Sequence, residues 1–589
     1  MTDFLSQNRP ENGRFGVILK YLKGYKGYLV VGGIAIVMAN ILILVIPYLT
    51  KLVFDLLEKK APAGEILKYV LAMFGLAILS GIFRFTTRRT IVWMSRHLEY
   101  NLRGELVAHL LKLSPSYYDV TRTGDIMARA TNDLEAVRKM TGPGIMYITN
   151  TVVSLVIAVG FMLYLSPRLT LYSLLPMLVF PYAVNKLGNL VHRKFIKIQE
   201  QFSRITATAQ ENLAGIRVVK AYGQEQNEYD NFSEESQKYI RHNLGMARLQ
   251  GTLFPLIYFL ASALNLLILY FGAQEVWDGK IELGTMVAFF AYLHGLFWPM
   301  FAMGWVVSLY QRGTASLDRI NRILFTEPII KNKVEKPYRG KLKGKIEFKN
   351  LKFGYNGSAV LDGIDLVIEP SQTVGVVGMT GSGKSTLAGL LARLYLVEDN
   401  RLYIDDIDIN KWDLSTLRRQ LGFVPQEPFL FSDTVAKNIL FGAERDDENT
   451  LLAAARTAAL DKDVRDFPGG YGTIVGERGI TLSGGQKQRA AIARALAVSP
   501  GILVLDDVTS SVDTETENEI YDRLDENYRT CTRIIISHRV SSVKEADMII
   551  FLEDGRIVEQ GGHDELMRLD GRYAELYRSQ LLEMEIEKL

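Results

Sequence analysis

Long stretches without a charged residue set the first half of the chain apart from the second. Each exceeds the roughly 20 residues that a helix needs to cross about 30 Å of hydrocarbon. These stretches lie between Lys26 and Lys51, Lys139 and Arg168, Arg248 and Glu275, and Glu282 and Arg312. The shorter intervals Lys68 to Arg84 and Arg168 to Lys186 become spans if their flanking cations reach the interface. The pattern predicts six transmembrane helices, and buried soluble helices are the alternative.

Basic residues at the ends of these spans predict the orientation of the membrane half. Cations cluster before the first span and after the second, as cytoplasmic flanks do: Arg14, Lys20, Lys23 and Lys26, then Arg84, Arg88, Arg89, Arg96 and Arg103. Because the number of spans is even, we expect both termini in the cytoplasm. The segment 14–28 alternates apolar residues with lysines, which favours an amphipathic helix on the membrane surface or a solvated arm.

The connections between the spans are unequal in length. Those predicted outside are short, whereas the inner ones, 84–139 and 186–248, are long and rich in helix formers. Within them, 116–137 and 211–232 each break near a glycine and place aromatic residues beside charges. We expect either short helices that dock on another domain or ordinary turns between long helices.

A change of pattern after Arg322 predicts a second domain. A polar stretch rich in Lys and Pro comes first, and then short β-rich runs such as TVGVVG, GILVLDD and RIIISH alternate with helical segments. This alternation is typical of a mostly parallel sheet covered by helices. We therefore predict a transmembrane domain over 1–325, a linker over 326–344 and an α/β domain over 345–589.

Composition alone predicts an ordinary globular protein, with 48% apolar and 23% charged residues. The 68 basic and 65 acidic side chains nearly balance at +3, which gives no reason to expect a nucleic-acid partner. Cys531 is the single cysteine, so an intrachain disulfide and a multi-cysteine zinc site are excluded.

A phosphate-binding motif opens the second domain. In TVGVVGMTGSGKST, an apolar strand leads into a glycine-rich loop and a helix, and Gly378, Gly383, Lys384 and Ser385 match GxxxxGK[ST]. Glycines let backbone N–H groups approach phosphates at a helix N-terminus. Lys384 would reach the β- and γ-phosphates, and the Ser385 hydroxyl would bind Mg²⁺.

Polar residues at other strand ends complete a candidate hydrolytic site. Asp506 would hold Mg²⁺ and Asp507 would address the attacking water. Gln426 could reach metal or water, and His538 follows a further strand. A single Gln or His at such a position is more often structural, but open α/β sheets bind ligands at their carboxyl ends, so the joint placement favours function.

With these residues in place, the second domain resembles the nucleotide-binding domain of ATP-binding cassette (ABC) transporters, and the whole chain resembles a bacterial half-transporter of the exporter type. The motif LSGGQKQR over 482–489 carries the resemblance. The implied fold is a polytopic α-helical membrane domain of six transmembrane helices fused to an α/β P-loop nucleotide-binding domain. The implied function is ATP-driven export.

The resemblance also implies roles for individual residues. Tyr355 would stack on adenine, and His538 would contact the γ-phosphate. In that family the signature binds ATP held by the opposite subunit's P-loop; the residues here are Ser483, Gly484, Gly485 and Gln486. The resemblance also implies that this chain's own ATP is held by its P-loop residues, which are Gly378, Thr380, Gly381, Ser382, Gly383, Lys384, Ser385 and Thr386. Ser385, Gln426 and Asp506 would hold Mg²⁺, and Asp507, His538 and Gln426 would serve catalysis.

Asp507 departs from the family pattern. Competent members have Glu after the metal-binding Asp, and the carboxylate of Asp507 is one methylene shorter. By resemblance to heterodimeric exporters with one degenerate site, we expect a slow ATP site here and an intact signature that completes the partner's active site. A tolerated change in a working homodimer is the alternative.

The substrate is not specified by any motif. The fifth and sixth predicted spans are rich in aromatic residues and Met, which suits varied amphiphilic ligands, although helix packing also explains such residues. They are Phe254, Tyr258, Phe259, Phe289, Phe290, Tyr292, Phe297, Trp298, Met300, Phe301, Met303 and Trp305, and His294 lies mid-span. Drug export, lipid or peptide export, and a mainly regulatory ATP-binding subunit remain as hypotheses.

Overall fold

The computed structural model describes residues 15–587 except 178, 356, 446, 477, 478, 480, 510 and 511. Side chains are also left undescribed at 175–185, 187–189, 192, 253, 254, 256, 257, 260, 261, 297, 298, 300, 301 and 583–587. The chain divides into two compact units. The first comprises residues up to Leu111 together with Arg122–Thr326, and the second comprises Lys112–Thr121 and Glu327–Leu589.

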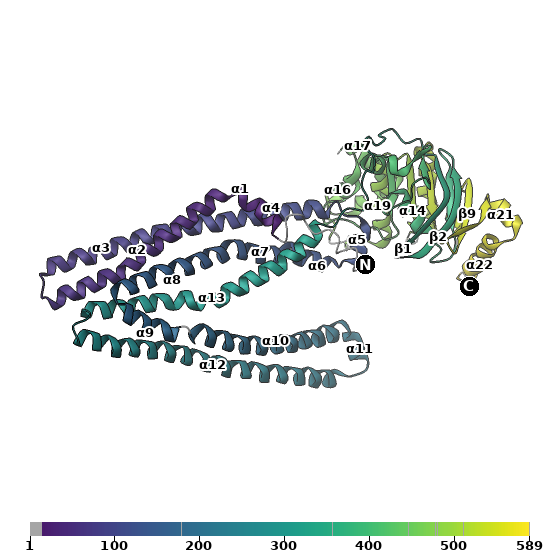
Figure 1. Ribbon diagram of the computed structural model, residues 1–589. Helices are drawn as coiled ribbons and strands as arrows, with labels where there is room; N and C mark the ends of the chain where they lie inside the picture. Colours follow the sequence, from purple (N-terminus) through teal and green to yellow (C-terminus); the bar gives the residue numbers. More distant parts are fainter. Residues whose placement is uncertain are drawn as a thin grey trace. The chain divides into compact units, whose positions relative to one another are not determined.

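The described residues of the first unit form helices joined by short connections (Figure 1). Its long helices include the pairs α2 with α3 and α10 with α12, which lie side by side. The helices are α1 (Gly16–Gly24), α2 (Lys26–Glu58), α3 (Ala63–Thr87), α4 (Trp93–Leu110), α6 (Thr123–Ala128), α7 (Leu134–Lys139), α8 (Ile145–Leu165), α9 (Pro167–Met177), α10 (Val179–Ala214), α11 (Ile216–Ala221), α12 (Glu225–Trp277) and α13 (Leu283–Leu324).

Helices occupy each stretch predicted to span a membrane. Within the described residues, three helical segments are long and apolar enough to cross one: Lys26–Glu58, Ala63–Leu110 and Thr123–Leu165. The predicted fourth, fifth and sixth spans fall on α9 with α10, on α12 and on α13, where several side chains lie outside the described set.

Three π-helical turns interrupt the long helices: η1 (Arg88–Val92), η2 (Arg129–Asp133) and η3 (Met140–Gly144). Such turns insert a residue and often mark functional positions. At η3 the backbone approaches α4 so closely that a Cβ on Gly142 would lie 2.5 Å from Ser95 Oγ. Glycine is therefore required at this crossing.

The second unit contains two sheets. A six-stranded sheet has the order β10-β9-β3-β8-β7-β6, and all its pairings are parallel except that of β10 with β9. The prediction of a mostly parallel sheet describes this part, but it missed the four-stranded antiparallel sheet, β2-β1-β4-β5. The strands are β1 (Ile346–Tyr355), β2 (Ser358–Ile368), β3 (Thr373–Val377), β4 (Leu402–Ile404), β5 (Ile407–Asp408), β6 (Leu421–Val424), β7 (Ile502–Asp506), β8 (Thr532–Ile536), β9 (Met548–Glu553) and β10 (Arg556–Gly561).

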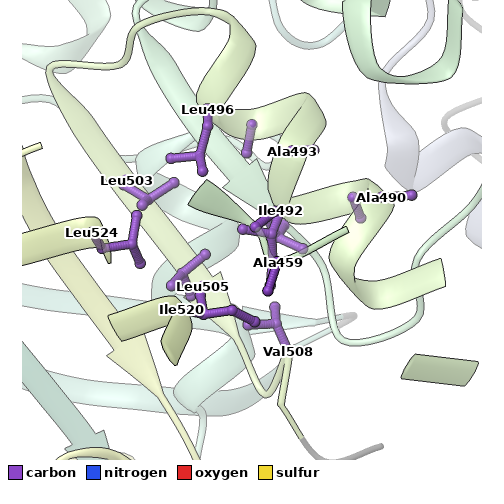
Figure 2. Close-up of a cluster of buried hydrophobic side chains, with 14 of the residues drawn as sticks. Ala459, Ala490, Ile492, Ala493, Leu496, Leu503, Leu505, Val508, Ile520 and Leu524 are labelled. Atoms are coloured by element: carbon purple, nitrogen blue, oxygen red, sulfur yellow. The ribbon is translucent and has the colours of Figure 1, made fainter. Parts of the chain in front are cut away.

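Helices cover the larger sheet and bury its apolar residues. Figure 2 shows the part of this core formed by residues of α19, β7 and α20, among them Ile492, Leu505 and Ile520. Strands β3, β7 and β8 are buried along their whole length, as central parallel strands are. The α-helices described in the second unit are α5 (Pro115–Val120), α14 (Lys384–Leu391), α15 (Leu414–Arg419), α16 (Val435–Ile439), α17 (Glu448–Thr457), α18 (Asp461–Asp466), α19 (Gly484–Ala497), α20 (Thr514–Asn527), α21 (His563–Leu569) and α22 (Arg572–Glu587).

The stretch predicted as a linker lies almost entirely in the second unit. Asn332 Nδ2 donates to Asp413 Oδ1 at 2.9 Å, and the backbone N–H of Tyr338 donates to the carbonyl of Lys411 at 2.9 Å. These polar residues therefore form part of the folded surface of the domain that they precede.

Candidate active site

The glycine-rich loop between β3 and α14 has the backbone that its sequence requires. Gly378, Gly381 and Gly383 have φ values of +147°, +84° and +102°, a region that favours glycine. A Cβ would lie 2.1 Å from the carbonyl oxygen of Leu552 at Gly378 and 2.7 Å from Leu361 Cδ2 at Gly383. Two of the glycines are thus required by space as well as by φ.

Two polar side chains of this loop suit a phosphate. Lys384 is buried, and its Nζ donates to the carbonyls of Gly378 and Met379, both at 2.9 Å. Burial lowers the pKa of Lys384, while Asp506 and Asp507 oppose that shift. Ser382 Oγ is buried with no hydrogen-bond partner among the described residues. A buried unpaired hydroxyl is costly, and a phosphate oxygen would satisfy it. The loop therefore fits the phosphates of ATP.

Two of the three predicted metal ligands, Ser385 and Asp506, meet at the end of β7, whereas Gln426 bonds to Asp507. Ser385 Oγ donates to Asp506 Oδ1 at 3.0 Å. Burial raises the pKa of Asp506, the bond from Ser385 opposes the shift, and the charge of Asp507 adds to it. Among the described residues no group of three or more His, Cys, Asp and Glu could hold a metal. One carboxylate and one hydroxyl suit Mg²⁺, which keeps waters and shares phosphate oxygens and would neutralise charge on the phosphates.

The three predicted catalytic residues follow adjacent strands of the larger sheet. Asp507 is buried in a left-handed backbone conformation, φ +49°, and its N–H donates to the carbonyl of Ile536 at 2.8 Å. Gln426, which is exposed, reaches it through a long Nε2 to Oδ2 bond of 3.4 Å. His538 is half-buried after β8, within electrostatic reach of Asp506. Side chains distant in sequence are thus gathered where open α/β sheets bind ligands.

Tyr355, at the end of β1, lies beside the phosphate loop and leads to an aromatic group that sequence reasoning missed. Its hydroxyl is 3.3 Å from Thr386 Oγ1, and its ring packs edge-on against Tyr395 at 5.1 Å. Tyr395 in turn donates to Asp119 of α5 at 3.4 Å. Burial, Tyr355 and Asp119 raise the pKa of Tyr395 to about 12. No local pattern marks a contact between positions 119 and 395.

The signature forms the start of α19. Ser483 is its N-cap and makes a reciprocal capping box with Gln486, and Gly484 and Gly485 fill the first turn. Gln486 Nε2 also donates to Asp463 at 3.1 Å. The hydrogen bonds of Ser483 and Gln486 therefore run to their own helix and to α18 rather than to the phosphate loop. Ser483 and Gly484 remain exposed at a positive helix end, which suits an anion.

Several residues singled out from the sequence have side chains that lie outside the described set. These are Phe254, Phe297, Trp298, Met300 and Phe301. Asp513 is the N-cap of α20 and accepts from Thr516 N–H. Phe289 and Tyr292 are fully buried within the helices, so these two serve packing, whereas Tyr258, Phe259, Met303, Trp305 and His294 are exposed and Phe290 is half-buried.

Comparison with known proteins agrees with this geometry. The ABC transporter transmembrane region model matches residues 29–300, and the ABC transporter model matches 361–510. The probable multidrug resistance ABC transporter ATP-binding/permease protein YheI of Bacillus subtilis is 37% identical, with 86% of this chain and 89% of that protein covered. An ATP-dependent lipid A-core flippase of Nitrosococcus oceani is 34% identical, with 87% and 86% covered.

A solved structure shares the fold. It is a bacterial Atm1-family ABC exporter with ATP bound, which is 28% identical with a TM-score of 0.78 over 94% of this chain and 99% of that one. The prediction of a helical membrane domain joined to an ATP-binding domain is confirmed. From its phosphate loop, its signature and these relatives, the chain belongs to the ABC transporter family as a bacterial exporter whose ATPase is coupled to transport.

Proposed function

We propose that this chain is one half of a heterodimeric exporter that moves amphiphilic compounds, including drugs, across the bacterial cytoplasmic membrane. Its own P-loop and Asp507 would form a slow ATP site. Its signature would complete the active site of a partner that carries Glu at the equivalent position. The single observation that carries the proposal is Asp507 itself.

The surroundings of Asp507 support a weakened base. The side chain is buried, and its bond to Gln426 is long at 3.4 Å. A Glu would extend the carboxylate by one methylene toward a water between Asp506 and the phosphates. General acid–base catalysis contributes about 10²- to 10⁴-fold in rate. A base whose carboxylate does not reach the attacking water would therefore slow hydrolysis by up to that factor and leave ATP binding intact.

The signature supports the other half of the proposal. Ser483 caps α19, and Gly484 is exposed beside it, so the N-terminus of this helix is available to the γ-phosphate of ATP on a second chain. Such a chain would contribute fully to its partner's site even though its own site is slow.

Substitution of Asp507 tests the proposal. The tagged full-length chain is isolated with its natural partner, and ATP turnover is compared for wild type, Asp507→Glu and Asp507→Asn. We expect the Glu variant to raise turnover at the chain's own P-loop by about tenfold or more and the Asn variant to leave total turnover nearly unchanged. Abolition of turnover by Asp507→Asn, or ordinary turnover by a purified homodimer of this chain, would contradict the proposal.

Lipid or peptide export is a second candidate, favoured by the 34% identity to a lipid A-core flippase. In vesicles that contain the assembled dimer, amphiphilic drugs should stimulate the ATPase if the first proposal holds. Stimulation by one lipid class or by a peptide, without a drug response, would favour the second. A mainly regulatory ATP-binding subunit would show no hydrolysis at its own P-loop in the wild type; Asp507→Asn would then change nothing, and Asp507→Glu would raise turnover sharply.

The basic flanks of the first two predicted spans support a topology with both termini and the ATP-binding domain in the cytoplasm. Labelling of cysteines introduced near each terminus, with a membrane-impermeant maleimide on intact cells, tests it. We expect no labelling at either terminus until the membrane is opened.

A further inference from the structure

The C-terminal helix α22 packs against the loop that carries His538. Tyr573 and Ala574, in its first turn, are fully buried, and Tyr573 shares a core with Val540 and Val543 from the segment after His538. Residues 573, 576, 577 and 580 fall on one face of the helix because they are three, four and seven positions apart. Gln580 therefore faces the same loop two turns further along.

The side-chain amide of Gln580 makes two hydrogen bonds to this loop. Its Nε2 donates to the carbonyl of His538 at 2.6 Å, and its Oε1 accepts from the backbone N–H of Val540 at 2.9 Å. The two bonds fix the orientation of the amide, since exchanging its ends would set a donor against the Val540 N–H. A side chain 42 positions away thus clamps the backbone on both sides of Arg539.

Two other hydrogen bonds of this loop do not involve the carbonyl of His538. The N–H of Ser537 donates to Val376 of β3 at 3.2 Å, and the N–H of Arg539 donates to Ser537 Oγ at 2.9 Å. Both fix the strand side of the loop. The bond from Gln580 acts on the peptide plane that follows the Cα of His538, so it fixes the ψ angle from which the imidazole projects.

We propose that Gln580 is a positioning residue for ATP hydrolysis: α22 sets the backbone of His538 and thereby the direction of its imidazole toward the γ-phosphate. The proposal concerns the chain's own ATP site and holds for a fast or a slow site, so it does not depend on a heterodimer. A movement of α22 would therefore change the rate of ATP hydrolysis at this site.

The test compares variants of the full-length chain, isolated from host membranes with whichever partner it has. Gln580→Met keeps the size of the side chain and removes both bonds. Gln580→Glu keeps the acceptor for Val540 and loses the donor to His538. Ser579→Ala alters the exposed neighbour in the same helix and serves as the matched control. His538→Ala and the double variant with Gln580→Met complete a cycle.

The assay reads this chain's own site. Photoreactive 8-azido-ATP, labelled at the α-phosphate, is cross-linked after timed incubation with Mg²⁺, and the two chains are separated. Total label on this chain's band reports nucleotide binding, and the ratio of ADP to ATP on the band reports hydrolysis at its P-loop. A misplacement of about 1 Å costs up to 10²-fold in rate, which sets the expected scale.

We expect Gln580→Met to slow hydrolysis by about 10- to 100-fold, with label yield within twofold of wild type. Gln580→Glu should fall between Met and wild type, and Ser579→Ala should match wild type. In the His538→Ala background, Gln580→Met should add nothing, because its effect passes through His538.

Three results would overturn the proposal. One is a wild-type rate in Gln580→Met. Another is a double variant in which the two losses multiply, and the third is a label yield that falls in parallel with the rate, which would indicate a merely structural role. If Gln580→Met fails to accumulate, Gln580→Glu carries the same cycle with the same criteria.

Discussion

Alanine substitutions at two glycines of the phosphate loop separate backbone strain from lack of space. Gly381 and Gly383 both have positive φ, +84° and +102°. A Cβ at Gly381 meets nothing within 4 Å, whereas one at Gly383 lies 2.7 Å from Leu361 Cδ2 and 3.1 Å from the carbonyl oxygen of Val360. Leu361 is buried, so it has little room to withdraw. The two variants therefore share one cost and differ in the other.

The magnitudes follow from these distances. A Cβ in the left-handed region costs about 1–2 kcal/mol, which applies to both variants. Overpacking a filled core costs about 1–3 kcal/mol more, which applies to Gly383→Ala alone. We expect local destabilisation of about 1–2 kcal/mol for Gly381→Ala and about 2–5 kcal/mol for Gly383→Ala. The difference corresponds to about 5- to 150-fold in the opening equilibrium of the loop.

Hydrogen–deuterium exchange of the nucleotide-free protein measures this difference. Peptides that cover β3, α14 and the Val360–Leu361 segment of β2 should exchange about 5- to 150-fold faster in Gly383→Ala than in Gly381→Ala. Peptides of the first unit serve as the internal control and should be unchanged. Equal exchange in the two variants, or the larger effect in Gly381→Ala, would refute the steric reasoning.

Three further predictions rest on other contacts. Because burial raises the pKa of Asp506, protons should compete with Mg²⁺ at a higher pH than at an exposed Asp. Because its pKa is raised in the folded state, the contribution of Asp506 to folding stability is present at acid pH and is lost as pH rises through the raised pKa. Asp506→Asn should therefore raise the melting temperature of the nucleotide-free protein at neutral pH but not at acid pH. A difference in melting temperature that does not depend on pH would contradict this. Tyr355→Leu should weaken ATP binding by about 5- to 150-fold and Tyr355→Phe much less, measured by equilibrium binding of ATP, since stacking on a base is worth about 1–3 kcal/mol; equal losses would argue against stacking. Gly142→Ala should destabilise the helical unit by about 1–3 kcal/mol in denaturant unfolding, and Ser95→Gly in the same chain should restore part of that stability. Gly160→Ala, which has open space around its Cβ, is the control. Absence of rescue by Ser95→Gly would refute the predicted clash.

A candidate ATP site could be proposed from the sequence because its residues lie in short, contiguous patterns. Gly378 to Ser385 is one loop, and its glycines are recognisable from spacing. Asp506 and His538 could be assigned because each follows an apolar run, and parallel strands bring their carboxyl ends to one edge. Charge-free stretches identified the membrane helices for a similar reason, since the length of a span is set by the bilayer rather than by tertiary contacts.

What the amino-acid pattern left open depends on contacts between distant parts of the chain. The grouping of Lys112–Thr121 with the ATP-binding unit, the contact of Tyr395 with Asp119 and the clamp of Gln580 on His538 join segments with no common local signal. Gln580 belongs to no local motif, and its contact with the His538 loop exists only because α22 packs against that loop. Local sequence patterns therefore determined which groups are candidates for binding and hydrolysing ATP, and tertiary packing decided how those groups are held.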